Sequence, residues 1–158
     1  MKIEREEEIM DNNKEEDNLF QLVRFSLPIT KPGVKNKWGI TFNEESYLSI
    51  MNSEAMQERL RDKTLFLVAG SFTDNNIFKV RFEDIVGWIV AWCPEKIMVE
   101  MPLDNYKRYI KPYGKKNCRA GIMSCGKFIK EDNKPREFKI YKIAGFQLLL
   151  KDYTVIKK

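Results

Sequence analysis

The longest apolar run in the chain, IVGWIVAWC at residues 85–93, places the tightest limit on the fold. It is about half the roughly 20 residues that a membrane-spanning helix needs. Both of its faces are apolar, which is typical of a central strand, and Gly87 marks a bulge or a close backbone approach. Residues 93–96 (CPEK) predict a tight turn, after which Ile97–Met101 pairs back as a hairpin.

Shorter strand patterns, bounded by glycine, proline and asparagine, surround this hairpin. They are Leu19–Leu27, Ile40–Phe42, Thr64–Ala69, Ile77–Phe82, Arg119–Phe128, Phe138–Ile143 and Phe146–Leu150. The last two are separated by Ala144 and Gly145. Because strands and helices do not alternate, the chain predicts an α+β, mainly β class. We expect a compact β-barrel or sandwich of about eight strands with one or two packed helices.

Two helical segments are expected. Asn43 is followed by two glutamates and by apolar residues three to four apart, which predicts a helix that starts at Asn43 and ends near Asp62. Ser53 either lies at a kink or caps a second, short helix. Asp104 is expected to cap another short helix over residues 105–110.

Charge divides the chain. Residues 1–18 hold eight acids and three bases, a net −5, whereas residues 105–158 hold fifteen bases and four acids, a net +11. We therefore expect an acidic, flexible N-terminal arm over residues 1–18 and a single β-rich domain over residues 19–158. The basic C-terminal third fits contact with nucleic acid or with an acidic protein surface, or it simply keeps a β-rich protein soluble.

The densest cationic set is interleaved with tyrosines and is the predicted partner- or nucleic-acid-binding site. It comprises Lys107, Arg108, Lys111, Lys115, Lys116 and Arg119. Lysine and arginine contact phosphates, and aromatic rings stack on bases, so the pattern is typical of single-strand binding surfaces. Alternatively, in a helix, Tyr106, Tyr109 and Ile110 share one face, and that face belongs to the core.

Catalytic chemistry is constrained by the absence of histidine from the whole chain. Ser-His and Cys-His pairs are therefore excluded, and with them the usual base near neutral pH. Cys93, Cys118 and Cys125 lack the paired spacing of a zinc site, so neither a metal nor another cofactor is expected. Cys125 is expected to be a buried, inert thiol, and Gly121, Ser124 and Gly126 to let a strand pass close to its neighbours.

Three segments carry a resemblance to a known family: KNKWGITF at 35–42, RAGIMS at 119–124 and IAGFQLL at 143–149. With the order of the elements around them, over roughly residues 22–150, they resemble the tailed-phage prohead (capsid-maturation) proteases. The resemblance implies a protease-like fold and places Ser124 on the family's nucleophile. The family's histidine would fall near residues 70–76, where this chain has GSFTDNN, so Ser124 is a vestigial candidate and no catalytic residue is expected.

The resulting hypothesis is a non-enzymatic structural or assembly module with a prohead-protease-like fold. It would be a phage virion or capsid-associated component that binds other virion proteins, with a homo-oligomer as an open option. Two alternatives stay open: a serine protease with an unconventional Ser124/lysine site, and a small nucleic-acid-binding β-barrel. The cysteines are odd in number and irregularly spaced, and we find no signal peptide or membrane segment. These features indicate that the protein is located in the host cytoplasm or in the virion.

Overall fold

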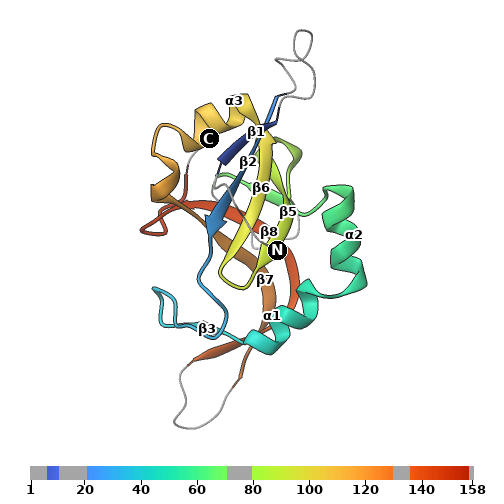
Figure 1. Cartoon of the computed structure of the whole chain (residues 1–158). Coiled ribbons are helices and arrows are strands. Elements are labelled where there is room, and N and C mark those ends of the chain that lie inside the picture. Colours follow the sequence, from blue (N-terminus) through green and yellow to red (C-terminus); the bar gives the residue numbers. More distant parts are fainter. Residues whose placement is uncertain (1–6, 11–20, 71–79, 130–135, 157–158) are drawn as a thin grey trace.

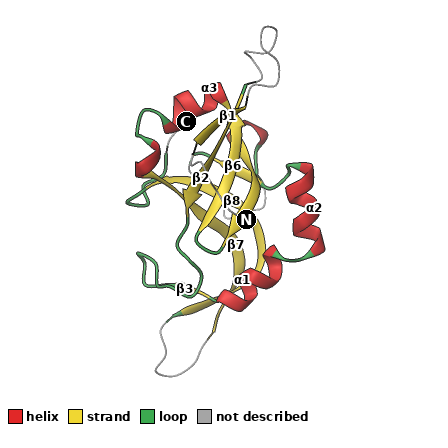
Figure 2. Ribbon diagram, in the orientation of Figure 1, coloured by secondary structure: helices red, strands yellow, loops and turns green. Residues whose placement is uncertain are grey.

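Eight strands form one mixed sheet in the computed structural model, which describes residues 7–10, 21–70, 80–129 and 136–156 (Figures 1 and 2). The strands are β1 (Glu7–Met10), β2 (Leu22–Pro28), β3 (Thr41–Phe42), β4 (Phe66–Val68), β5 (Ile85–Cys93), β6 (Lys96–Pro102), β7 (Cys118–Ile129) and β8 (Glu137–Leu150). They pair in the order β1-β2-β6-β5-β4-β8, and β8 also pairs with β3 and β7. The α+β, mainly β class is confirmed, although within these residues the sheet does not close into a barrel.

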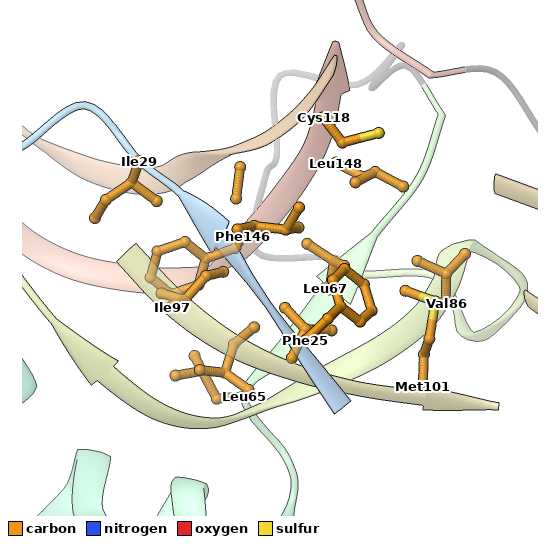
Figure 3. Close-up of a cluster of buried hydrophobic side chains, with 14 of the residues drawn as sticks. Phe25, Ile29, Leu65, Leu67, Val86, Ile97, Met101, Cys118, Phe146 and Leu148 are labelled. Atoms are coloured by element: carbon orange, nitrogen blue, oxygen red, sulfur yellow. The ribbon is translucent and has the colours of Figure 1, made fainter. Parts of the chain in front are cut away.

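The predicted central hairpin is confirmed. β5 and β6 pair antiparallel, and β2 pairs antiparallel with the other edge of β6. Gly87 lies at a close approach, because a Cβ atom there would be 2.8 Å from the Glu100 carbonyl oxygen. Alternate residues of β2 and β6 point into a common core that also receives β4, β7 and β8 (Figure 3). Among its fully buried members are Phe25, Leu67, Ile97, Val99 and Phe146.

β8 corrects one prediction, because Phe138–Ile143 and Phe146–Leu150 belong to a single 14-residue strand. Gly145 keeps an extended conformation and lies against β4, where a Cβ atom would be 2.8 Å from the Phe66 carbonyl oxygen. The glycine therefore permits strand packing here instead of ending a strand. One edge of β8 pairs antiparallel with β7, and the other pairs parallel with β3 and β4.

Two capped helices follow β3. Helix α1 (Glu44–Met51) begins after Asn43, whose side chain accepts a hydrogen bond from the Ser46 amide. Helix α2 (Glu54–Asp62) begins after Ser53, whose hydroxyl accepts from the Met56 amide. The split at Ser53 is thus confirmed, and both helices lie outside the sheet, α1 against β8 and α2 against β5 (Figure 1).

Two local predictions were wrong. Helix α3 (Leu103–Asn105), which continues as a π-helix (Tyr106–Ile110), has Pro102 at its N-terminal cap and no side-chain cap, so Asp104 lies inside the first turn. Residues 77–79 lie outside the described residues, but 80 and 81 are not in a strand and Phe82–Asp84 is a short 3-10 helix. The Arg81 guanidinium, 3.0 Å from the Asp84 carboxylate, helps to close this turn. A second 3-10 helix, Lys115–Asn117, precedes β7.

The N-terminal arm is described only at β1, where Glu7–Met10 pairs antiparallel with β2. The division into an arm over residues 1–18 and a domain over 19–158 stays a prediction. No helix in the described ranges is long and apolar enough to cross a membrane.

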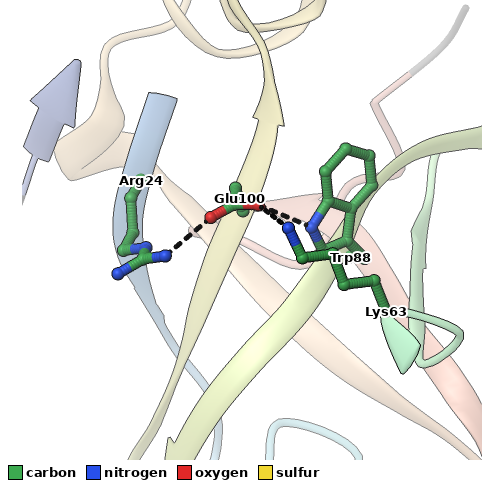
Figure 4. Close-up of polar contacts among 4 residues, drawn as sticks. All are labelled: Arg24, Lys63, Trp88 and Glu100. Atoms are coloured by element: carbon green, nitrogen blue, oxygen red, sulfur yellow. Dashed lines mark hydrogen bonds and ion pairs between the residues drawn. The ribbon is translucent and has the colours of Figure 1, made fainter. Parts of the chain in front are cut away.

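A buried carboxylate lies on the face of β6 opposite the core. Glu100 is 0% exposed and alternates with the core residues Val99 and Met101. Its oxygens accept hydrogen bonds from Arg24 at 2.7 Å, Lys63 at 3.0 Å and Trp88 Nε1 at 3.0 Å (Figure 4). These donors come from β2, the end of α2 and β5. The carboxylate therefore ties three strands and a helix end together.

Burial acts to raise the pKa of Glu100, but the hydrogen bonds from Arg24, Lys63 and Trp88 outweigh it, and the pKa lies below its ordinary value. A lowered pKa in the folded state contributes stability above the pKa of the unfolded chain. That stability is lost as the pH falls through the folded-state pKa.

We predict that Glu100→Gln lowers the free energy of unfolding at pH 7 by about 2–4 kcal/mol, because it leaves the Arg24 and Lys63 cations without their counter-charge. The difference from the parent should shrink as the pH falls below the ordinary glutamate pKa and through the lowered folded-state pKa, because the parent carboxylate then also becomes neutral. Urea unfolding measured from pH 3 to pH 7 tests this. Glu95→Gln, at an exposed position in the same hairpin, is the matched control and should change little. A pH-independent deficit in Glu100→Gln would contradict the electrostatic account.

Candidate functional site

Ser124 and Cys125 lie on β7 between two irregularities of strand register. Ser124 pairs with Ile143 and Cys125 with Lys142, and the register shifts just before Ser124 and just after Cys125. Bulges of this kind re-aim side chains and are frequent beside functional sites. The RAGIMS segment of the family resemblance therefore ends in an irregular part of the strand.

Arg59 of α2 holds the strand opposite Ser124. Its guanidinium donates to the carbonyl oxygens of Ile143 at 2.9 Å and of Ala144 at 2.7 Å. Burial lowers the pKa of Arg59. These bonds satisfy carbonyl groups at the irregularity that the neighbouring strand leaves open, so a helix residue fixes the local shape of the sheet.

Gly121 and Gly126 of β7 allow the strand to lie close to its neighbours, as predicted. A Cβ atom at Gly126 would lie 1.9 Å from the Lys139 carbonyl oxygen, and one at Gly121 would lie 2.9 Å from Leu149 Cδ1. Both distances are too short for a real side chain. At Gly126 only glycine fits with the present backbone, because the contact is with a backbone oxygen, whereas at Gly121 the Leu149 side chain would have to shift.

No base serves the Ser124 hydroxyl within the part of the chain that the structure describes. The side chain is half-buried, and it makes no hydrogen bond with another described side chain. The segment 71–76, where the resemblance places the family's histidine, lies outside the described residues, but the sequence contains no histidine at all. The described residues also contain no group of three His, Cys, Asp or Glu side chains able to hold a metal.

The cysteines correct one expectation. Cys125 is exposed rather than buried. Cys118 is the buried cysteine, and burial raises the pKa of its thiol to about 11. The buried thiol is therefore protonated, and so a poor nucleophile, at neutral pH.

The predicted cationic set is spread over the π-helix, the following turn and the start of β7. Lys107, Arg108, Lys111 and Lys116 are exposed, and Lys115 is half-buried. The Arg119 guanidinium makes other contacts. It donates a hydrogen bond to the Thr30 hydroxyl at 2.6 Å and lies 4.1 Å from the centre of the Tyr153 ring.

The tyrosines between these cations belong mainly to the core. Tyr106 and Tyr109 are each 8% exposed, and the Tyr106 ring packs edge-on against Phe25. Burial therefore excludes a stacking role for Tyr106 and Tyr109, which with Ile110 form the alternative, a core-facing stripe. Tyr113, the third tyrosine among the cations, is 41% exposed. The binding role of the cations stays a prediction.

A pocket of about 190 Å³ was not anticipated from the sequence. It is lined by Thr30, Asn36, Trp38, Ile40, Phe42, Ala120, Gly121, Ile122, Gln147, Leu149 and Tyr153. Its rim is formed by Trp38, which is 58% exposed and packs edge-on against Tyr153.

The segment KNKWGITF, one of the three that carry the family resemblance, contains the turn on which Trp38 lies. The Asn36 side chain accepts hydrogen bonds from the amides of Trp38 and Ile40, both at 3.0 Å. Gly39 has a φ of 77°, a left-handed conformation that favours glycine. The Asn and Gly of this motif therefore have a structural reason to be three residues apart.

Comparison with known proteins supports the fold. No family model matches the chain, and no curated protein sequence matches it. Among solved structures, the chain is similar to the capsid assembly protease gp21 of bacteriophage T4, with a TM-score of 0.58 and 12% sequence identity. The match covers 96% of this chain and 91% of that chain. At this identity the likeness shows the fold alone, and it confirms that the chain has a fold similar to that of a phage prohead protease.

Proposed function

We propose that this chain is a non-enzymatic assembly module with a prohead-protease-like fold. It binds other proteins of a phage virion or capsid, in the host cytoplasm or in the particle. The fold similarity to a capsid assembly protease supports the assembly context. The single observation that carries the non-enzymatic part is a serine without a base: Ser124 has no described side-chain partner, and the chain has no histidine.

The physical argument concerns the activation of the hydroxyl. A serine hydroxyl is a weak nucleophile at its ordinary pKa and becomes active when an adjacent base takes its proton. Loss of the base from a serine–base unit removes nearly as much catalysis as loss of the serine itself. A fold similar to that of a protease, without this pair, retains its shape and its surfaces for binding.

We predict that a fluorophosphonate probe labels the parent protein no more than it labels Ser124→Ala. Ser49→Ala, at an exposed position on α1, is the matched control for background reaction, and an active serine hydrolase in the same tube verifies the probe. Labelling is measured by intact-mass spectrometry at pH 7 and again at pH 10.

The second pH tests the unconventional Ser124/lysine site, because a lysine acts as a base only when it is deprotonated. Labelling that requires Ser124 and grows with pH would overturn the proposal in favour of a serine–lysine protease. Equal, low labelling of all three proteins at both pH values supports it.

The acidic arm, residues 1–18, is part of the proposal as a docking element beside an independently folded domain. A chain of residues 19–158 should keep a cooperative thermal transition. Its melting temperature should fall by about 2–4 °C if the lost pairing of β1 with β2 contributes about 1 kcal/mol. Full-length protein with Glu15→Gln, Glu16→Gln and Asp17→Asn is the control, since it removes charge but keeps β1. Loss of the cooperative transition in the shortened chain would contradict the domain division.

A further inference from the structure

The outer part of the β7–β8 hairpin projects beyond the sheet. This part comprises residues 124–129 of β7, residues 137–142 of β8 and the preceding Arg136, and it is called here the hairpin surface. Figure 1 shows it extending past α1 and β3. It carries four bases and one acid, a net charge of +3. The one acid, Glu137, accepts a hydrogen bond from the Asn43 side chain.

Two lysines face each other across the hairpin surface. Lys127 and Lys139 are direct cross-strand partners, and both are exposed. Like charges placed opposite each other destabilise a strand pair. Neither lysine forms an ion pair with a residue that the structure describes. Among the described residues these two cations therefore have no counter-charge, and an anionic partner would relieve their repulsion.

The outer edge of β7 is open along the same segment. On β8, the opposite edge is covered, because Thr41 and Asn43 donate to the carbonyls of Arg136 and Phe138, and Ser46 accepts from the Ile140 amide. No described strand pairs with the outer edge of residues 124–129. An open edge presents unpaired N–H and C=O groups, on which an extended peptide adds as a further strand.

The surroundings of Phe128 favour a protein partner over nucleic acid. Phe128 is 37% exposed, but the Arg136 guanidinium lies 4.5 Å from its ring centre and Phe138 packs edge-on against it. A ring face covered by a guanidinium is not available to stack on a base. The Phe128 ring still offers apolar area to a peptide side chain, as does Tyr141, which is 53% exposed.

We propose that the hairpin surface binds an extended acidic segment of a partner protein, which adds as a strand to the free edge of β7 and places carboxylates near Lys127 and Lys139. This inference rests on the proposed assembly function and names the chemistry of the partner. The main chain supplies the pairing, and the two lysines select for negative charge.

The test uses the full-length protein and a fluorescein-labelled octapeptide of alternating glutamate and valine. Fluorescence anisotropy should show saturable binding that weakens with salt. The double variant Lys127→Glu with Lys139→Glu should bind roughly tenfold or more weakly, because two attractive contacts become repulsive. Lys31→Glu with Lys151→Glu changes the net charge equally at two exposed lysines outside both the hairpin surface and the predicted cationic set, and it should retain binding. An octapeptide of alternating lysine and valine should not bind.

A second arm needs no protein variant. N-methylation of every second peptide amide removes the N–H groups that would pair with β7, so one of the two methylated registers should lose at least tenfold in affinity while the other is less affected. Equal binding of both registers would overturn strand addition even if the charge-reversed protein did not fold.

Equal loss in both charge-reversed variants, or preferential binding of an oligothymidylate 20-mer, would also overturn the proposal, the latter in favour of nucleic acid. These outcomes are independent of the Ser124 labelling experiment. Failure of the partner proposal is thus distinguishable from failure of the non-enzymatic proposal.

Discussion

The buried carboxylate of Glu100 is the constraint on which the register of the sheet depends. Arg24 on β2, Glu100 on β6 and Trp88 on β5 lie directly opposite one another across three strands. A slip of one residue in β6 would turn Glu100 into the apolar core, where an unpaired charge is costly. The same slip would bring Val99 and Met101 out of that core. The ion pairs and the core therefore specify the same register.

The sequence correctly predicts the structural features that depend on residues close together in the chain. Asn43 and Ser53 cap their helices because the cap is formed within three residues, and the central hairpin follows from apolar residues around a short turn. Predictions that depend on distant contacts failed. The sequence predicts a strand break at Gly145, because the residue on which this glycine packs, Phe66, lies far away in the sequence. The burial of Tyr106 likewise depends on Phe25, so the sequence left two faces possible for the tyrosines.

In the candidate site, too, some features are visible in the sequence and others depend on tertiary contacts. The lack of a histidine is visible in the sequence and is enough to exclude a Ser-His pair. The irregular register around Ser124 and the bonds from Arg59 to the facing strand are tertiary features, since Arg59 lies 84 residues from Ile143 and 85 from Ala144 in the chain. The pocket lined by Trp38 and Tyr153 combines residues that are far apart in the chain. No local sequence pattern could therefore predict it.

The pairing of β8 has a consequence for the order in which the protein is made. β3 and β4 lie in the first half of the chain, but β8, the strand with which both pair in parallel, comprises residues 137–150. On the ribosome, those edges stay open until nearly the whole chain has emerged, and contacts of such long sequence separation slow folding. The nascent chain therefore spends most of its synthesis time with apolar strand edges unsatisfied. Its yield in a cell should depend on translation speed and on chaperones that shield such edges.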